Sequence, residues 1–387
     1  MKITTAYIHI PFCKSKCFYC DFNSYAGKDD RISVYFNALN KEIGCVGSFY
    51  EKQKDSLTGP LESVYIGGGT PSYAPSGYVS KTIDTLRSVF GFADDIEITI
   101  ECNPGTADLD KFLEYKRCGI NRISIGLQST SDILLKNLGR IHTVQEFEEC
   151  VRNAGLAGFT NLNADLMSGL PGQKVSDITD SIKFLLKKNI SHISLYSLIL
   201  EEGTPFYERF GTCPELLPSE EIEREMYHTG VEELKNNGFL HYEISNLAKP
   251  GYFCKQNTRY WETYEYLGFG AGAHSYQQHT RHGNEPDIDS YIKRIDEFTG
   301  LSNAPCAVES NYLTLHDREL EYFLLGFRLL EGINGRQFKE YFGKGMVEYM
   351  PIFQKLADEG YIIWNNDNYR LSEKGIDYAN QVFIEFV

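Results

Sequence analysis

Three cysteines stand close together near the start of the chain, in the segment YIHIPFCKSKCFYCDF. Cys13, Cys17 and Cys20 offer thiolates, which bind zinc or iron–sulfur clusters. A 4Fe-4S cluster needs a ligand for each of its four irons, so three thiolates leave one iron open for a small molecule. A structural zinc ion needs four protein ligands, and the fourth would have to come from a distance, from His9 or Cys102 for example. The spacing therefore indicates a metal centre and leaves both kinds open.

Glycine and polar residues follow several strand-like runs farther along the chain. The glycines of IGGGTP, at residues 66–71, let a ligand approach the backbone and its free N–H and C=O groups. Glu101 follows the run IEITI, Gln128 ends SIGLQ, and Asp165 lies within LNADLMSG. Each alone reads as a loop or capping residue, but several at successive strand ends indicate one pocket, where a carboxylate suits hydroxyl or amino groups.

The elements that would hold these residues alternate between short β-branched runs and longer amphipathic segments up to about residue 245. Residues 143–157, for example, have helical spacing, with Thr143 as the expected N-cap and Gly158 as the end. Strands that alternate with helices predict an α/β fold with a parallel sheet, here a full or partial (β/α) barrel. In such barrels the chemistry lies at the C-terminal strand ends, where this chain has its unusual residues.

The chain after about residue 300 has a different pattern. Two helix-like segments, RELEYFLLGFRLLEG and GMVEYMPIFQKLADEG, precede YIIWNNDNYRLS, which predicts a hairpin that turns over residues 365–368. Helices followed by a hairpin resemble a winged-helix module. We therefore predict two domains, residues 1–300 with the metal centre and residues 301–387 as a small helical domain.

Charge and composition narrow the classes of partner. The 387 residues carry 38 basic and 53 acidic side chains, a net charge of -15, which disfavours nucleic acid as a partner. Residues 317–387 hold eight Lys and Arg against twelve Asp and Glu, so the second domain is also a poor candidate for DNA binding. No signal-peptide pattern and no run of 18 apolar residues is present, so we expect a cytoplasmic protein without a transmembrane segment.

Six segments in order, CKSKCFYC, YIGGGTPS, IECNPGT, RISIGLQS, LGRIH and LMSGLPGQ, resemble the radical S-adenosylmethionine (SAM) superfamily. The similarity is to the branch that contains oxygen-independent coproporphyrinogen III oxidases and HemW heme chaperones, and it extends to the C-terminus. It implies a 4Fe-4S cluster on the three cysteines, with SAM bound at the open iron. By motif, it places these residues along the SAM site: Tyr7, Tyr19, Gly68, Gly69, Thr70, Glu101, Gln128, Arg140 and Asp165.

Phe22 separates the two groups of that branch. The oxidases that this chain resembles carry an additional cysteine at this position, whereas the HemW chaperones have the CDF ending that is present here. The resemblance therefore favours a heme chaperone that passes heme to an acceptor protein, with an electron donor such as flavodoxin or ferredoxin. The alternative is a radical SAM enzyme that generates a 5′-deoxyadenosyl radical to act on a porphyrin or another substrate. A third possibility, a regulator that acts through the winged-helix-like tail, is disfavoured by the acidic charge.

One position departs from the pattern of the HemW chaperones, which have a His-Asn-x-x-Tyr-Trp motif that the resemblance associates with heme. This chain reads CKQNTRYW, with Gln256 at the histidine position, and an amide is a poor iron ligand. Tyr260 and Trp261 remain as aromatic surfaces for a macrocycle, or as core aromatics. Three other side chains are candidate axial ligands: Cys254, His274 and His142.

Overall fold

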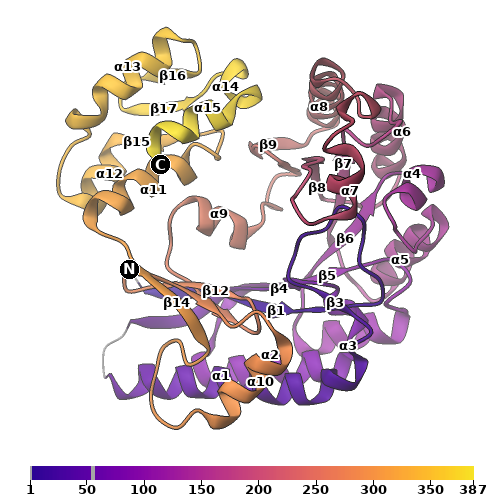
Figure 1. The fold of residues 1–387 in the computed structure, drawn as a ribbon, viewed down its shortest axis with the longest axis vertical. Coiled ribbons are helices and arrows are strands. Elements are labelled where there is room, and N and C mark those ends of the chain that lie inside the picture. The colour runs from indigo at the N-terminus through magenta and orange to yellow at the C-terminus, as the bar shows by residue number, and fades with distance from the viewer. Residues whose placement is uncertain (1, 54–56) are drawn as a thin grey trace.

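The computed structural model describes residues 2–53 and 57–387 and contains one nine-stranded sheet that curves into an open barrel (Figure 1). Its strand order is β11-β1-β4-β5-β6-β7-β8-β10-β9. Six strands run parallel in succession: β1 (Ile3–Ile10), β4 (Thr58–Gly68), β5 (Phe92–Cys102), β6 (Arg122–Gln128), β7 (Asn161–Ser168) and β8 (His192–Ser197). The predicted α/β class and partial barrel are confirmed.

The strands at the two edges of this sheet do not pair with each other, so the barrel is open. At one edge, β11 (Leu267–Phe269) pairs parallel with β1. At the other, β10 (Asn246–Ala248) runs antiparallel to both β8 and β9 (Leu240–Glu243). Residues 240–248, whose alternating pattern also fits one continuous strand, thus form a tight hairpin. The alternation of side chains is the same in both arrangements, so the local pattern did not distinguish them.

Amphipathic helices cover the outside of the barrel (Figure 1). They are α1 (Ile32–Lys52), α2 (Ser76–Phe90), α3 (Leu109–Cys118), α4 (Asp132–Asn137), α5 (Val144–Leu156), α6 (Val175–Leu186), α8 (Glu220–Asn236) and α10 (Ile288–Glu297). Helix α5 begins with the expected cap: the Thr143 hydroxyl accepts from the backbone N–H of Glu146, whose carboxylate accepts from that of Thr143. None of the helices in the described ranges is long and apolar enough to cross a bilayer.

The inner face of the barrel is mostly polar, unlike the apolar outer face that the helices cover. Neighbouring strands align their inward side chains in rows, so that Ser124 lies beside Asn163, and Asn163 beside His192. Most of these side chains are buried: Ser63, Glu97, Thr99, Arg122, Ser124, Asn163, His192 and Ser194. Buried polar groups need hydrogen-bond partners, so this face forms a hydrogen-bond network and not a hydrophobic core.

A short helix, α9 (Lys255–Trp261), lies between β4 and the C-terminal helix α11 (Leu315–Gly326) (Figure 1). A three-stranded sheet lies between α9 and α11 in the chain and consists of β12 (His274–Gln277), β13 (Thr280–Asn284) and β14 (Ala307–Tyr312). Strand β14 therefore lies past residue 300 yet pairs with β13, within the larger unit.

The C-terminal part has its own hydrophobic core, built by residues from Tyr322 to Phe386. It contains α11, α12 (Gly335–Phe342), α13 (Met350–Asp358), α14 (Glu373–Asp377), α15 (Ala379–Phe383) and a sheet of β15 (Ile333–Asn334), β17 (Asn368–Leu371) and β16 (Ile362–Asn365). The hairpin β16–β17 pairs Asn365 with Asn368, as predicted from the sequence. The first helix is shorter than its sequence pattern, because the chain turns after Gly326.

Candidate functional site

A cavity of about 380 Å³ opens at the C-terminal ends of the parallel strands. The predicted site residues that line it are Cys17, Tyr19, Cys20, Gly68, Gly69, Thr70, Glu101, Gln128, Arg140 and Asp165. They come from the cysteine loop, the ends of β4 to β7 and the segment after α4, so the barrel brings together residues that are far apart in the chain. Tyr7 does not line this cavity. Its hydroxyl bonds to His9 Nδ1 at 3.0 Å, and its ring lies 6.3 Å from that of Tyr65.

The loop with the three cysteines begins at the short strand β2 (Phe12–Cys13), which pairs with β3 (Tyr25–Ala26). Thr70 Oγ1 donates to Cys13 Sγ at 3.5 Å, and Arg140 Nη1 donates to Cys17 Sγ at 3.6 Å. Burial raises the pKa values of the Cys13 and Cys20 thiols, so metal loading has to displace their protons.

The sulfur environment fits a cluster better than a single ion. Hydroxyl and guanidinium donors aimed at thiolate sulfurs are the groups that tune iron–sulfur centres. The two proposed fourth zinc ligands are engaged elsewhere: His9 bonds to Tyr7 and to Asn23 O, and Cys102 Sγ lies 3.8 Å from Cys150 Sγ.

The glycines after β4 let the strand end pass directly behind the cysteine loop. A Cβ atom on Gly69 would lie 2.9 Å from Phe12 O and 3.0 Å from Cys13 Sγ, and Gly68 has a φ of 115°. A side chain on Gly69 would push the cysteine loop away from the cavity, whereas a Cβ atom on Gly68 would lie 2.7 Å from the His9 ring. Glycine is therefore required for steric reasons, because the backbone at this point separates the cavity from the cysteine sulfurs.

Two carboxylates face the cavity from β5 and β7. Glu101 accepts from the Tyr65 hydroxyl at 3.0 Å and from the Gly68 backbone N–H at 3.2 Å. Burial, together with the nearby charge of Asp165, raises the pKa of Glu101 to about 7. Burial also raises the pKa of Asp165, against the lowering effect of the hydrogen bond from Asn163. Both groups have lone pairs left for hydroxyl or ammonium donors of a ligand.

Arg140 joins the cavity to three surrounding elements. Its Nη2 donates to Asn103 Oδ1 at 2.7 Å and to Gly126 O at 2.8 Å, while its Nε donates to His142 Nδ1 at 3.3 Å. With Nη1 also bonded to Cys17, four of the five guanidinium N–H groups are already used. Arg140 therefore contributes charge and one spare donor to a ligand, and the bidentate grip on a carboxylate is not available to it.

Gln128 reaches the cavity through an unusual backbone. It has a φ of 70°, in the left-handed region, at an irregularity between β6 and β7. Such a conformation costs a non-glycine residue roughly 1–2 kcal/mol. Strained residues of this kind gather at functional sites, where the side-chain direction they provide is used.

The sequence analysis missed several lining residues: Asn103, Ser124, Met167, Tyr196, Ser197 and Ile199. Alternate polar residues along a strand were the available signal for some of them. Ser124 and Gly126 lie on the same face of β6, and Tyr196 follows Ser194 on β8 with the same period of two. Ile199 and Phe22 are exposed lining residues, so part of the rim of the cavity is apolar.

Gln256 and the three candidate axial ligands have very different environments. Gln256 is buried and its Oε1 accepts from the Ser63 hydroxyl at 2.7 Å, so it points into the barrel wall. Cys254 is fully buried, which raises the pKa of its thiol to about 11. Burial and the Arg140 charge lower the pKa of the buried His142 to about 3. Among these four, His274 alone has an exposed side chain.

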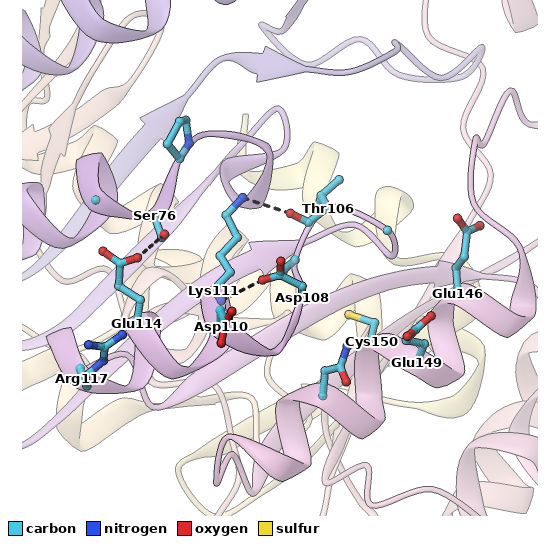
Figure 2. Close-up of a pocket in the computed structure, with 15 residues that line it drawn as sticks. Ser76, Thr106, Asp108, Asp110, Lys111, Glu114, Arg117, Glu146, Glu149 and Cys150 are labelled. Atoms are coloured by element: carbon cyan, nitrogen blue, oxygen red, sulfur yellow. Dashed lines mark hydrogen bonds between the residues drawn. The ribbon is translucent and has the colours of Figure 1, made fainter.

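A second cavity, of about 670 Å³, lies outside the barrel between α2, α3 and α5 (Figure 2). Lys111 extends across it to the backbone oxygen of Thr106 at 3.1 Å, and Ser76 is bonded to Glu114. Its remaining charged side chains, Asp108, Asp110, Arg117, Glu146 and Glu149, belong to helix termini and surfaces. None of the predicted site residues lines this cavity, although it is the larger one.

Two family profiles match separate parts of the chain. The profile of the Radical SAM superfamily matches residues 7–185, and that of the HemN C-terminal domain matches residues 313–378. The heme chaperone HemW of Bacillus subtilis (strain 168) is 34% identical over 385 residues, which cover 99% of each chain. The mitochondrial radical S-adenosyl methionine domain-containing protein 1 of Danio rerio is 30% identical over 388 residues, covering 96% of this chain and 84% of that protein.

The solved structure of coproporphyrinogen III oxidase (HemN) from Escherichia coli superposes with a TM-score of 0.83. The superposition covers 100% of this chain and 90% of the oxidase, at 21% sequence identity. The shared fold therefore includes the C-terminal part as well as the barrel.

Proposed function

The chain belongs to the HemW family of the radical SAM superfamily, and from this membership we propose that it binds a 4Fe-4S cluster and SAM and carries heme to an acceptor protein. Cys13, Cys17 and Cys20 would ligate three irons, and SAM would occupy the cavity beside them. When bound, the cluster supplies an open iron for the amino and carboxylate groups of SAM. The observation that carries the proposal is the cavity itself, whose wall contains two of the cysteines and both carboxylates.

The residues of the cavity divide the work of holding SAM. Glu101 and Asp165 accept hydrogen bonds from hydroxyl or ammonium groups, while Arg140 supplies positive charge near the sulfurs. Phe22, Ile199 and Tyr196 add exposed apolar surface to the lining, which the apolar parts of SAM could contact.

Heme binding, as we propose it, does not use residue 256. The Gln256 side chain is buried against Ser63, and its helix is fixed by an ion pair of 2.7 Å between Arg259 and Glu62. His274 is exposed and is the axial ligand we propose, because neutral imidazole is a common ligand of heme iron. Relatives named heme chaperones supply the choice of heme as the cargo.

Hemin titration of anaerobically reconstituted protein tests the heme assignment. The wild-type Soret band should shift, and His274→Ala should weaken binding by about tenfold or more, whereas the exposed His228→Ala control should not. Gln256→His should leave the affinity unchanged, because its imidazole would be buried beside Ser63. Tight binding gained only in Gln256→His would contradict the proposal and place the heme at α9. Absence of a Soret shift in every variant would remove the heme assignment.

An assay for 5′-deoxyadenosine separates the carrier from the enzyme alternative. With SAM and a reductant present, a carrier should form only a slow background of this product, independent of added porphyrin. Product that increases with an added coproporphyrinogen would instead assign a catalytic reaction to the same cavity.

A further inference from the structure

A chain of buried hydrogen bonds runs from the cavity through the barrel to the start of α9. Asn163 Nδ2 donates to Asp165 Oδ1 at 2.8 Å, and Asn163 Oδ1 lies 2.6 Å from His192 Nδ1. On the other side of the imidazole, His192 Nε2 lies 2.8 Å from the Tyr242 hydroxyl. That hydroxyl accepts from the Cys254 backbone N–H at 3.3 Å. His192 is fully buried in the middle of this chain.

The Asp165 carboxylate at one end and the neutral state of His192 together set the direction of the bonds in this chain. The Cys254 N–H can only donate, and the Asp165 carboxylate can only accept when ionised. Asn163 must therefore turn its NH₂ group toward Asp165 and its carbonyl oxygen toward His192. The imidazole then carries its proton on Nδ1, and its bare Nε2 accepts from the Tyr242 hydroxyl. Burial and the charge of Arg122 lower the pKa of His192, which keeps the ring neutral, as this tautomer requires.

Asn163 has no spare hydrogen-bonding capacity in this arrangement. Besides the bonds to Asp165 and His192, its Nδ2 donates to Ser124 Oγ at 2.7 Å and its Oδ1 accepts from the Ser194 hydroxyl at 3.3 Å. An amide has two donors and two acceptor sites, so all four are used. The His192 contact is the shortest of the four. If it is lost, the Ser194 bond alone keeps the amide from flipping and presenting an oxygen to Asp165.

We infer that His192 is a positioning residue of the SAM cavity: through Asn163, it fixes the orientation of the Asp165 carboxylate, and Tyr242 fixes its tautomer. His192 does not line the cavity, so it acts without contacting the ligand. The inference deepens the proposed function, on which its SAM-binding test depends.

Two substitutions distinguish the roles of the two imidazole nitrogens, Nδ1 and Nε2. In His192→Asn the side-chain NH₂ lies near the former Nδ1 position and still donates to Asn163, whereas in His192→Gln the amide lies near the former Nε2 position. Isothermal titration of SAM into the reconstituted protein should give an affinity within about threefold of wild type for His192→Asn. The affinity should fall about tenfold for His192→Gln, since one hydrogen bond that orients a charged group is lost. Tyr242→Phe should give an intermediate loss.

A purely structural role of His192 predicts a different pattern. Equal losses in the two variants, or a larger loss in His192→Asn, would overturn the inference, as would unchanged affinity in His192→Gln. Melting temperatures identify variants that fail to fold.

The ¹⁵N shifts of the imidazole give a second test on the wild-type holoprotein, which needs neither a variant that folds nor bound SAM. They should report the Nδ1–H tautomer, and the Nε2–H tautomer would overturn the inference. If wild-type protein binds no SAM, the proposed function fails, and the tautomer still decides the hydrogen-bond chain.

Discussion

Replacing Arg140 by methionine should both destabilise the fold and loosen the cluster. The substitution keeps a long side chain but removes the guanidinium, which bonds to Asn103 at 2.7 Å, to Gly126 O at 2.8 Å and to the Cys17 sulfur at 3.6 Å. A hydrogen bond to a charged group contributes about 1.5–3 kcal/mol. The two short bonds together therefore correspond to a loss of roughly 3–5 kcal/mol, because such effects are not fully additive.

Urea denaturation of the cluster-free protein measures this loss, and the rate of iron release to a chelator measures the hold on the cluster. Arg140→Met should lower the free energy of unfolding and release iron faster than wild type. Arg152→Met is the matched control: Arg152 is exposed and, among the described residues, pairs only with Glu149 at 3.1 Å, so its loss should cost less than about 1 kcal/mol. Equal stability and equal iron release in the two variants would refute the role assigned to Arg140.

Three further predictions concern other parts of the site and its support. Gln128→Gly should relieve the left-handed backbone and leave the melting temperature unchanged or higher, but isothermal titration should show weaker SAM binding; lower stability with intact binding would contradict the strain argument. Burial raises the folded-state pKa of Glu42 to about 7, above roughly 4.3 when unfolded, so the folded chain binds the extra proton and loses stability as pH rises through this interval. Denaturation of Glu42→Gln at pH 5 and pH 8 should show this loss reduced by up to about 3 kcal/mol, and a pH dependence identical to wild type would exclude Glu42 as its source. Cys150→Ser should keep the full iron content, because the Cys150 and Cys102 thiols contact each other at 3.8 Å and not the cluster loop; loss of iron would place this pair at the metal centre.

Local patterns in the sequence were sufficient for much of the framework. The cap at Thr143 lies within four residues of its partner, so its hydrogen bonds are encoded in a short segment. The positions of Glu101, Gln128 and Asp165 at strand ends followed from the alternation of strands and helices, because parallel strands end at one rim. Ten of the residues that line the cavity were expected from the sequence, and one of them, Arg140, came from the resemblance to a family, because it has no strand-end signal.

Contacts between distant segments lay beyond that reasoning. The burial of Gln256 depends on Ser63, 193 positions earlier in the chain, and nothing in CKQNTRYW indicates that this side chain faces a strand. The chain of hydrogen bonds through Asn163, His192 and Tyr242 likewise depends on the register between β7 and β8 and on the hairpin β9–β10. A polar residue at every second position of LNADL was its only local signal, and it indicates an inward polar face without naming partners.

The iron and sulfide content of the anaerobically reconstituted protein, measured with its bound zinc, tests the central claim most directly. Three thiolates that hold one 4Fe-4S cluster predict about four irons and about four sulfides per chain, and loss of most of both when Cys17 is replaced by alanine. One zinc ion per chain with no sulfide, or iron content that is unaffected by Cys17→Ala, would contradict the account.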